Sequence, residues 1–140
     1  MTELIAALLS WIALHTGFAV GAHPEVRLVS LSELTERYHQ GGHPHRSGMR
    51  VVALYNPATA TVYLSKNWKP DSVVDQSKLL HELVHHLQLT NRVPRLCTGE
   101  LERQAYELQA AWLAEQGVVT PYNVMQVDPF TVKVLSLCGG

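Results

Sequence analysis

Two histidines and a glutamate lie close together in the segment LLHELVHHLQ, residues 79–88. His81 and His85 are four residues apart, so on a helix their rings project from the same face, one turn apart. This spacing lets two imidazole nitrogens bind one zinc ion at about 2.0–2.1 Å. Glu82 is turned by about 100° around the helix, where its carboxylate can reach a water molecule without binding the metal. The segment therefore predicts a zinc site with Glu82 as general base.

A catalytic zinc ion takes three protein ligands and keeps one open position, so a third ligand must come from another part of the fold. The segment GELERQAYELQ, residues 99–109, offers three glutamates. Glu102 is the preferred ligand, because Ala105 one turn later is small and allows two helices to approach closely. Glu100 is the reserve, since the helix dipole explains a carboxylate at a helix start. Glu107 lies about 140° around the helix from Glu102, toward the expected solvent side.

HELVHH followed by ELERQAY resembles the gluzincin metallopeptidases, which carry HExxH on one helix and ExxA on a following one. Within this group, the motifs are most similar to those of the compact minigluzincins and the ImmA/IrrE-like peptidases. The resemblance covers residues 79–106 and implies a zincin-like fold, with His81, His85 and Glu102 as zinc ligands and Glu82 as catalytic base.

The resemblance also implies how a substrate would reach the site. The hairpin arm at residues 61–65 would be an edge strand over the cleft, able to pair with an extended peptide. Tyr106, one turn beyond Glu102, is the candidate for orienting the site or stabilising charge. His86 points about 100° away from His85, so we expect it to be solvated or to hydrogen-bond to a metal ligand. Glu100 is a further candidate for such a supporting contact.

Two function classes remain open at this point. One is a zinc-dependent metallopeptidase that hydrolyses peptide bonds in a peptide or protein substrate. The other is a peptide-binding module on the same scaffold, catalytically weak or inactive. A purely structural zinc site is disfavoured because no fourth protein ligand is evident. The plainest alternative is an amphipathic helix whose histidines bind no metal.

Periodicity and turn residues predict the order helix, strand, helix, hairpin, helix, helix, helix. This order is typical of a compact α+β domain, with a small antiparallel-containing sheet packed on the HExxH helix and the following glutamate-bearing helix. We expect residues 1–140 to form one domain. After the first helix, the expected elements are a strand at 25–30, a helix from Ser32 to Gly41-Gly42, a hairpin at 49–68 around NPAT, a helix capped by Asp71 or Asp75 and closed at Asn91, a helix at 99–115, and a short helix at Asp128 and Pro129.

The N-terminal apolar stretch is read as a helix of the fold. Leu4, Leu8, Trp11 and Ile12 share one helix face, and Gly17 supplies a C-cap. The alternative is a signal peptide, but the stretch contains an acid and lacks the basic start of such leaders. The stretch is also too short and too interrupted by polar residues for a membrane span.

Composition narrows the partners and the compartment. The net charge of −1 and the 46% of apolar residues fit a soluble globular protein and argue against a nucleic-acid binder, which would be basic. The oligomeric state is left open. Cys97 and Cys138 are either two reduced thiols or one disulfide in an exported protein. Without a convincing leader, we expect the cytoplasm, with the periplasm or another exported location as the alternative.

Overall fold

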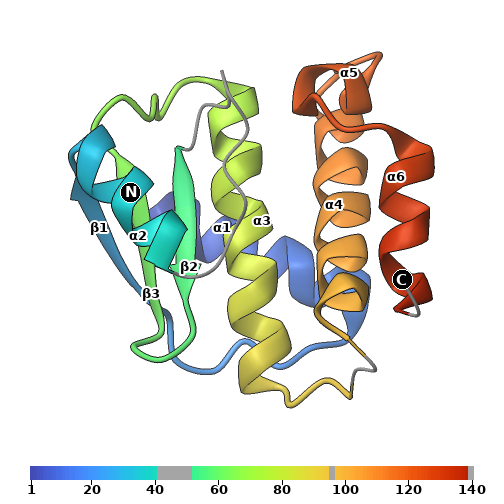
Figure 1. The fold of residues 1–140 in the computed structure, drawn as a ribbon, viewed down its shortest axis with the longest axis horizontal. Helices are drawn as coiled ribbons and strands as arrows, with labels where there is room; N and C mark the ends of the chain where they lie inside the picture. Colours follow the sequence, from blue (N-terminus) through green and yellow to red (C-terminus); the bar gives the residue numbers. More distant parts are fainter. Residues whose placement is uncertain (41–51, 95–96, 139–140) are drawn as a thin grey trace.

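The computed structural model describes residues 1–40, 52–94 and 97–138, and these ranges form an α+β structure with six α-helices and a three-stranded sheet (Figure 1). One face of the sheet is covered by the helix at residues 31–40. The other face packs against the helix that carries HELVHH. The elements are α1 (Thr2–Thr16), β1 (Glu25–Val29), α2 (Leu31–Gln40), β2 (Ala53–Asn56), β3 (Thr61–Ser65), α3 (Val73–Thr90), α4 (Thr98–Glu115), α5 (Pro121–Met125), α6 (Pro129–Val134) and the 3₁₀ turn η1 (Leu135–Leu137).

The strands run in the order β1-β3-β2. β2 and β3 form the predicted antiparallel hairpin, with Ala53 opposite Leu64 and Asn56 opposite Thr61. β1 lies parallel to β3 on its other side. The expectation that residues 61–65 form an edge strand is therefore wrong: β3 is the central strand, and all five of its residues are buried. Among the strands that the structure describes, the edge strand beside α3 is β2.

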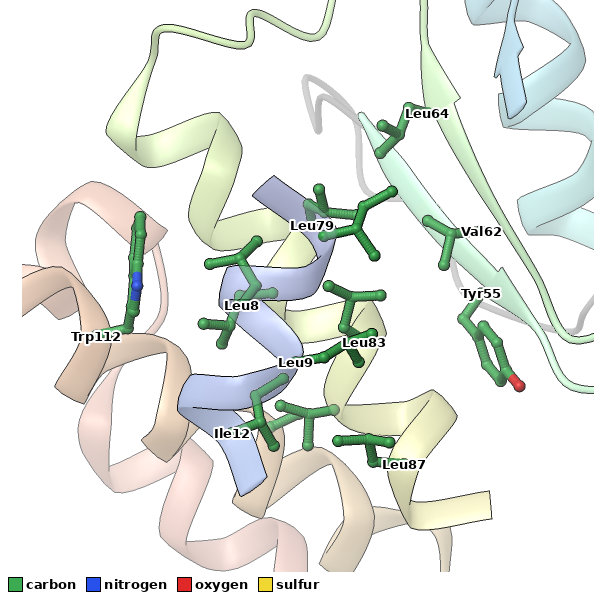
Figure 2. Packing of buried hydrophobic residues seen from close by; sticks show 14 of the residues in the cluster. Leu8, Leu9, Ile12, Tyr55, Val62, Leu64, Leu79, Leu83, Leu87 and Trp112 are labelled. Atoms are coloured by element: carbon green, nitrogen blue, oxygen red, sulfur yellow. The ribbon is translucent and has the colours of Figure 1, made fainter. Parts of the chain in front are cut away.

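α3 is the centre of the hydrophobic core. An apolar stripe at helical spacing runs along it, in which Leu79, Leu83 and Leu87 are fully buried. They face Leu8, Leu9 and Ile12 of α1, as Figure 2 shows, while Val62 and Leu64 of β3 approach from the sheet. The first helix thus packs as an element of the fold, and Gly17 ends it in the left-handed conformation at φ 82°.

No helix within residues 1–40, 52–94 and 97–138 is both long and apolar enough to cross a bilayer.

The caps of α2 and α3 differ from those expected. Ser72, rather than Asp71 or Asp75, caps α3, since its hydroxyl accepts the backbone N–H of Asp75 at 3.2 Å. The Asp75 carboxylate instead accepts the backbone N–H of Lys69 at 2.8 Å and holds the preceding turn.

The N-cap of α2 lies two residues earlier than the predicted Ser32, because Ser30 Oγ accepts the backbone N–H of Glu33 at 3.2 Å. The Gly41-Gly42 stop and residues 49–51 of the hairpin lie outside the described residues. Asp128 caps α6 as predicted, with Pro129 in the first turn. The sequence reading missed α5, which begins at Pro121.

The C-terminal segment is held against the first turn of α4. Cys97 and Cys138 form a disulfide with a Cα–Cα distance of 5.6 Å. At Gly99 a Cβ atom would lie 1.9 Å from the carbonyl oxygen of Leu135, so only glycine allows this approach. Arg103 Nη1 donates to Ser136 Oγ at 2.7 Å. α6 and η1 therefore brace the end of α4 nearest to Glu102.

Loss of the disulfide should destabilise the protein. The bridge joins residues 41 apart in sequence, and removal of a cross-link of this kind costs about 2–4 kcal/mol, largely by freeing the unfolded chain. We expect Cys138→Ser to lower the free energy of unfolding by this amount in urea titrations without reductant. Reductant should destabilise the wild type and leave the variant unchanged. Equal stability of the two proteins without reductant would show that the bridge does not support the fold.

Candidate metal centre

His81, His85 and Glu102 come together between α3 and α4. His81 and His85 lie one turn apart on α3, and Glu102 reaches them from α4. Glu102 Oε1 is 3.4 Å from His81 Nε2 and makes a closer contact with His85 Nε2. One ligand atom from each of the three residues lies within 4.8 Å of the others, so the group could hold a metal ion. Ala105, predicted to permit the close approach of the helices, is fully buried.

A hydrogen-bond chain determines which nitrogen of His81 faces Glu102. Ser77 Oγ donates to the carbonyl oxygen of Val74 at 2.6 Å, so it accepts from Gln109 Nε2 at 3.0 Å. The carboxamide oxygen of Gln109 consequently faces His81 Nδ1 at 2.9 Å, and that nitrogen must carry a proton. Nε2 of His81 is then the nitrogen that can bind a metal.

His85 is oriented in the same way by Gln88. Gln88 Nε2 donates to the carbonyl oxygen of Leu101 at 3.0 Å, and this oxygen can only accept. Gln88 Oε1 therefore faces His85 Nδ1 at 2.8 Å and accepts its proton. Both histidines present Nε2 toward the Glu102 carboxylate. Two imidazoles held by a second hydrogen bond and one carboxylate fit a three-ligand zinc site.

Charge interactions within the group are strong. Burial lowers the pKa of His85, but the hydrogen bond to Glu102 and the charges of Glu82 and Glu102 outweigh it and raise this pKa to about 9. Burial raises the pKa of Glu102, yet its hydrogen bonds with His81 and His85 outweigh this and hold the pKa far below its ordinary value. A proton on His85 thus occupies the nitrogen that a metal would need.

Glu82 is close both to the two histidines of the group and to the sheet. Burial raises the pKa of its carboxyl group, and the nearby charges of His81 and His85 oppose that rise. The carboxylate also accepts the backbone N–H of Tyr55, a residue of β2. The predicted general base is therefore held next to the edge strand, and its raised pKa suits a group that accepts a proton.

His86 is not solvated as one alternative expected, since only 2% of it is exposed. Its Nε2 donates to the carbonyl oxygen of Ala22 at 2.9 Å, so Nδ1 accepts from the Tyr55 hydroxyl at 3.0 Å. These bonds tie α3 to β2 and to the segment between α1 and β1. His86 therefore contacts the sheet side of α3 and not Glu102.

Tyr106 packs the edge of its ring against His81, with centroids 4.6 Å apart and planes at 64°. Glu100 lies in the first turn of α4 and is outside the three-residue group found in the described residues. Glu107 pairs with Arg103 at 2.5 Å on an exposed side of α4, as its helix angle predicted.

Two supporting residues were not identified from the sequence. They are Gln88 and Gln109, which are buried, with only 2% and 4% of the residue exposed. Their spacing from the predicted ligands in the sequence could have identified them. Gln88 follows His85 by three positions, and Gln109 follows Glu102 by seven, which keeps each on the ligand face of its helix.

Residues 1–132 match a family model described as "Domain of unknown function (DUF6647)". No curated protein and no solved structure matches the chain.

Zinc binding should depend on pH through His85. This group is protonated below its pKa of about 9, and zinc binds the unprotonated nitrogen, so binding at pH 7 should release about one proton. Apparent affinity should then rise about tenfold per pH unit between pH 6.5 and 8. Calorimetric titrations in two buffers of different ionisation enthalpy count the released protons. In Glu102→Gln, proton release should fall because the carboxylate that raises the pKa of His85 is gone. A titration of the wild type without proton release would contradict this assignment.

Proposed function

The chain belongs to the DUF6647 family, and we propose that it is a zinc-dependent metallopeptidase with a zincin-like fold. One observation carries the proposal: the Nε2 atoms of His81 and His85, each oriented by a buried glutamine, meet the carboxylate of Glu102 beside Glu82. Among the described residues, the candidate metal-binding group comprises three side chains. Three protein ligands leave a position for water or substrate, as a catalytic zinc requires.

The chemistry divides between the metal and Glu82. Bound zinc would lower the pKa of a water molecule toward about 7 and polarise the scissile carbonyl group. Glu82 would accept one proton of the attacking water as the new carbon–oxygen bond forms. It would then deliver that proton to the amide nitrogen as the carbon–nitrogen bond breaks. The products are a carboxylic acid and an amine, and Glu82 returns to its starting state.

The substrate would be a peptide in an extended conformation. β2, an edge strand, borders α3 and contributes the Tyr55 backbone to the surroundings of Glu82. An extended peptide pairing with β2 would therefore lie near the general base. Tyr106, against His81, is the candidate for stabilising charge on the substrate.

The disulfide bears on the compartment. Bridges such as Cys97–Cys138 persist in oxidising environments and are rare in a reducing cytosol. Of the two locations that the sequence left open, the bridge favours export over the cytoplasm.

Replacement of Glu82 by glutamine separates an enzyme from a binding module. We expect turnover of an unfolded protein substrate to fall by about 10²–10⁴-fold, because the general base is lost. Zinc content measured by elemental analysis should stay at about one ion per chain, since Glu82 is not a ligand.

Glu102→Ala is the matched variant, because it removes a ligand and should lose both zinc and turnover. A wild type that binds peptides without cutting them, with Glu82→Gln binding equally well, would identify a peptide-binding module. A wild type that takes up no zinc after reconstitution would refute the metallopeptidase.

A further inference from the structure

The carboxamide of Gln88 contacts both helices that carry the predicted metal ligands. The residue lies on α3 and is buried, with 2% of it exposed. Its oxygen accepts from His85 Nδ1 at 2.8 Å. Its nitrogen donates to the carbonyl oxygen of Leu101 at 3.0 Å and to Gln104 Oε1 at 2.8 Å, both on α4. Leu101 directly precedes Glu102, so one side chain joins a ligand on one helix to the neighbour of the ligand on the other.

We infer that Gln88 is a positioning residue that sets the spacing between His85 and Glu102, beyond choosing the nitrogen that His85 presents. This inference rests on the proposed zinc site. Ligand atoms must meet a metal within about 0.2 Å of ideal distances, yet these ligands come from two helices. Packing of apolar side chains is not directional, whereas a hydrogen bond to the Leu101 carbonyl fixes both distance and direction.

Gln109 makes a complementary connection from the opposite helix. It lies on α4 and reaches His81 on α3, where its nitrogen donates to the Ser77 hydroxyl. The two glutamines thus cross between the helices in opposite directions. Their remaining partners differ in kind. Gln88 gives one proton to the Leu101 backbone carbonyl, which can only accept, and the other to the Gln104 carboxamide oxygen, whereas Gln109 gives its proton to a hydroxyl, which can rotate and donate instead.

That difference makes the same substitution act unequally at the two sites. A carboxylate at position 88 can still accept from His85, but it cannot donate to Leu101 and would face the carbonyl oxygen without a proton between them. A carboxylate at position 109 can accept from His81 and also from a rotated Ser77 hydroxyl. The bond from position 88 to the α4 backbone at Leu101 is therefore broken in Gln88→Glu, even if the Gln104 carboxamide turns to donate to the new carboxylate, whereas the link through Ser77 is preserved in Gln109→Glu.

The experiment compares zinc affinity in Gln88→Glu, Gln109→Glu and the control Gln76→Glu by competition with a chromogenic chelator. Gln76 is also on α3, and its carboxamide nitrogen donates to the Pro70 carbonyl oxygen at 2.6 Å, ahead of the start of the helix. We expect Gln88→Glu to weaken zinc binding by about 10–100-fold, Gln109→Glu to weaken it less, and Gln76→Glu to match the wild type. Circular dichroism and thermal unfolding establish that each variant is folded.

Two readouts on the metal-free protein distinguish positioning from general loss of structure. Nitrogen-15 spectra should show that His85 keeps its proton on Nδ1 in Gln88→Glu, while amide exchange in residues 98–104 becomes faster than in Gln76→Glu. Wild-type zinc affinity together with unchanged exchange in Gln88→Glu would overturn the inference. If the wild type itself binds no zinc, the proposed function fails, and the exchange comparison alone decides whether Gln88 holds α4.

Discussion

The enclosure of α3 is the constraint on which the rest of the structure depends. The sheet covers one side of this helix, and α1 and α4 cover others, so its polar side chains have little access to water (Figures 1 and 2). A buried polar group without a partner costs free energy, so each of these groups must find one within the protein. His81 finds Gln109, His86 finds Tyr55 and Ala22, and Gln88 finds the Leu101 carbonyl. These hydrogen bonds fix the orientation of the side chains around the candidate site.

α4 supplies Glu102, the third member of the possible metal-binding group, and contacts on two sides of α4 fix its position. Toward α3, buried Ala105 permits close packing beside Glu102. Toward the C-terminus, the disulfide and the contact of Gly99 with Leu135 hold the first turn. The carboxylate then meets two imidazoles, which explains the raised pKa of His85 and the lowered pKa of Glu102. The same closeness lets a proton or a metal ion link the helices, so metal binding, protonation and helix packing are coupled.

Features encoded by local spacing could be predicted, whereas those set by long-range pairing could not. The stripe from Leu79 to Leu87 and the grouping of His81, His85 and Glu102 follow from helix periodicity and motif, and both are present. The position of β3 depends on β1, a strand distant in sequence whose pairing leaves no local signal, so the edge was assigned to the wrong strand. Gln88 and Gln109 were missed for a related reason: a glutamine in a helix is ordinary until a partner from the other helix is known.

The edge strand next to α3 is β2 and not β3 as predicted, so a substrate would meet the backbone of β2. Because β2 borders α3, Tyr55 gives its backbone N–H to Glu82 and its hydroxyl proton to His86, one turn further along the same helix. Two hydrogen bonds from one residue therefore set the separation between the edge strand and Glu82, the predicted general base. Because the Tyr55 N–H is directed to Glu82, a peptide added to β2 would pair through other backbone groups of this strand, and that pairing would fix its distance from Glu82. The side chain that fills the core beneath β2 thus also determines where a peptide bond would lie relative to Glu82.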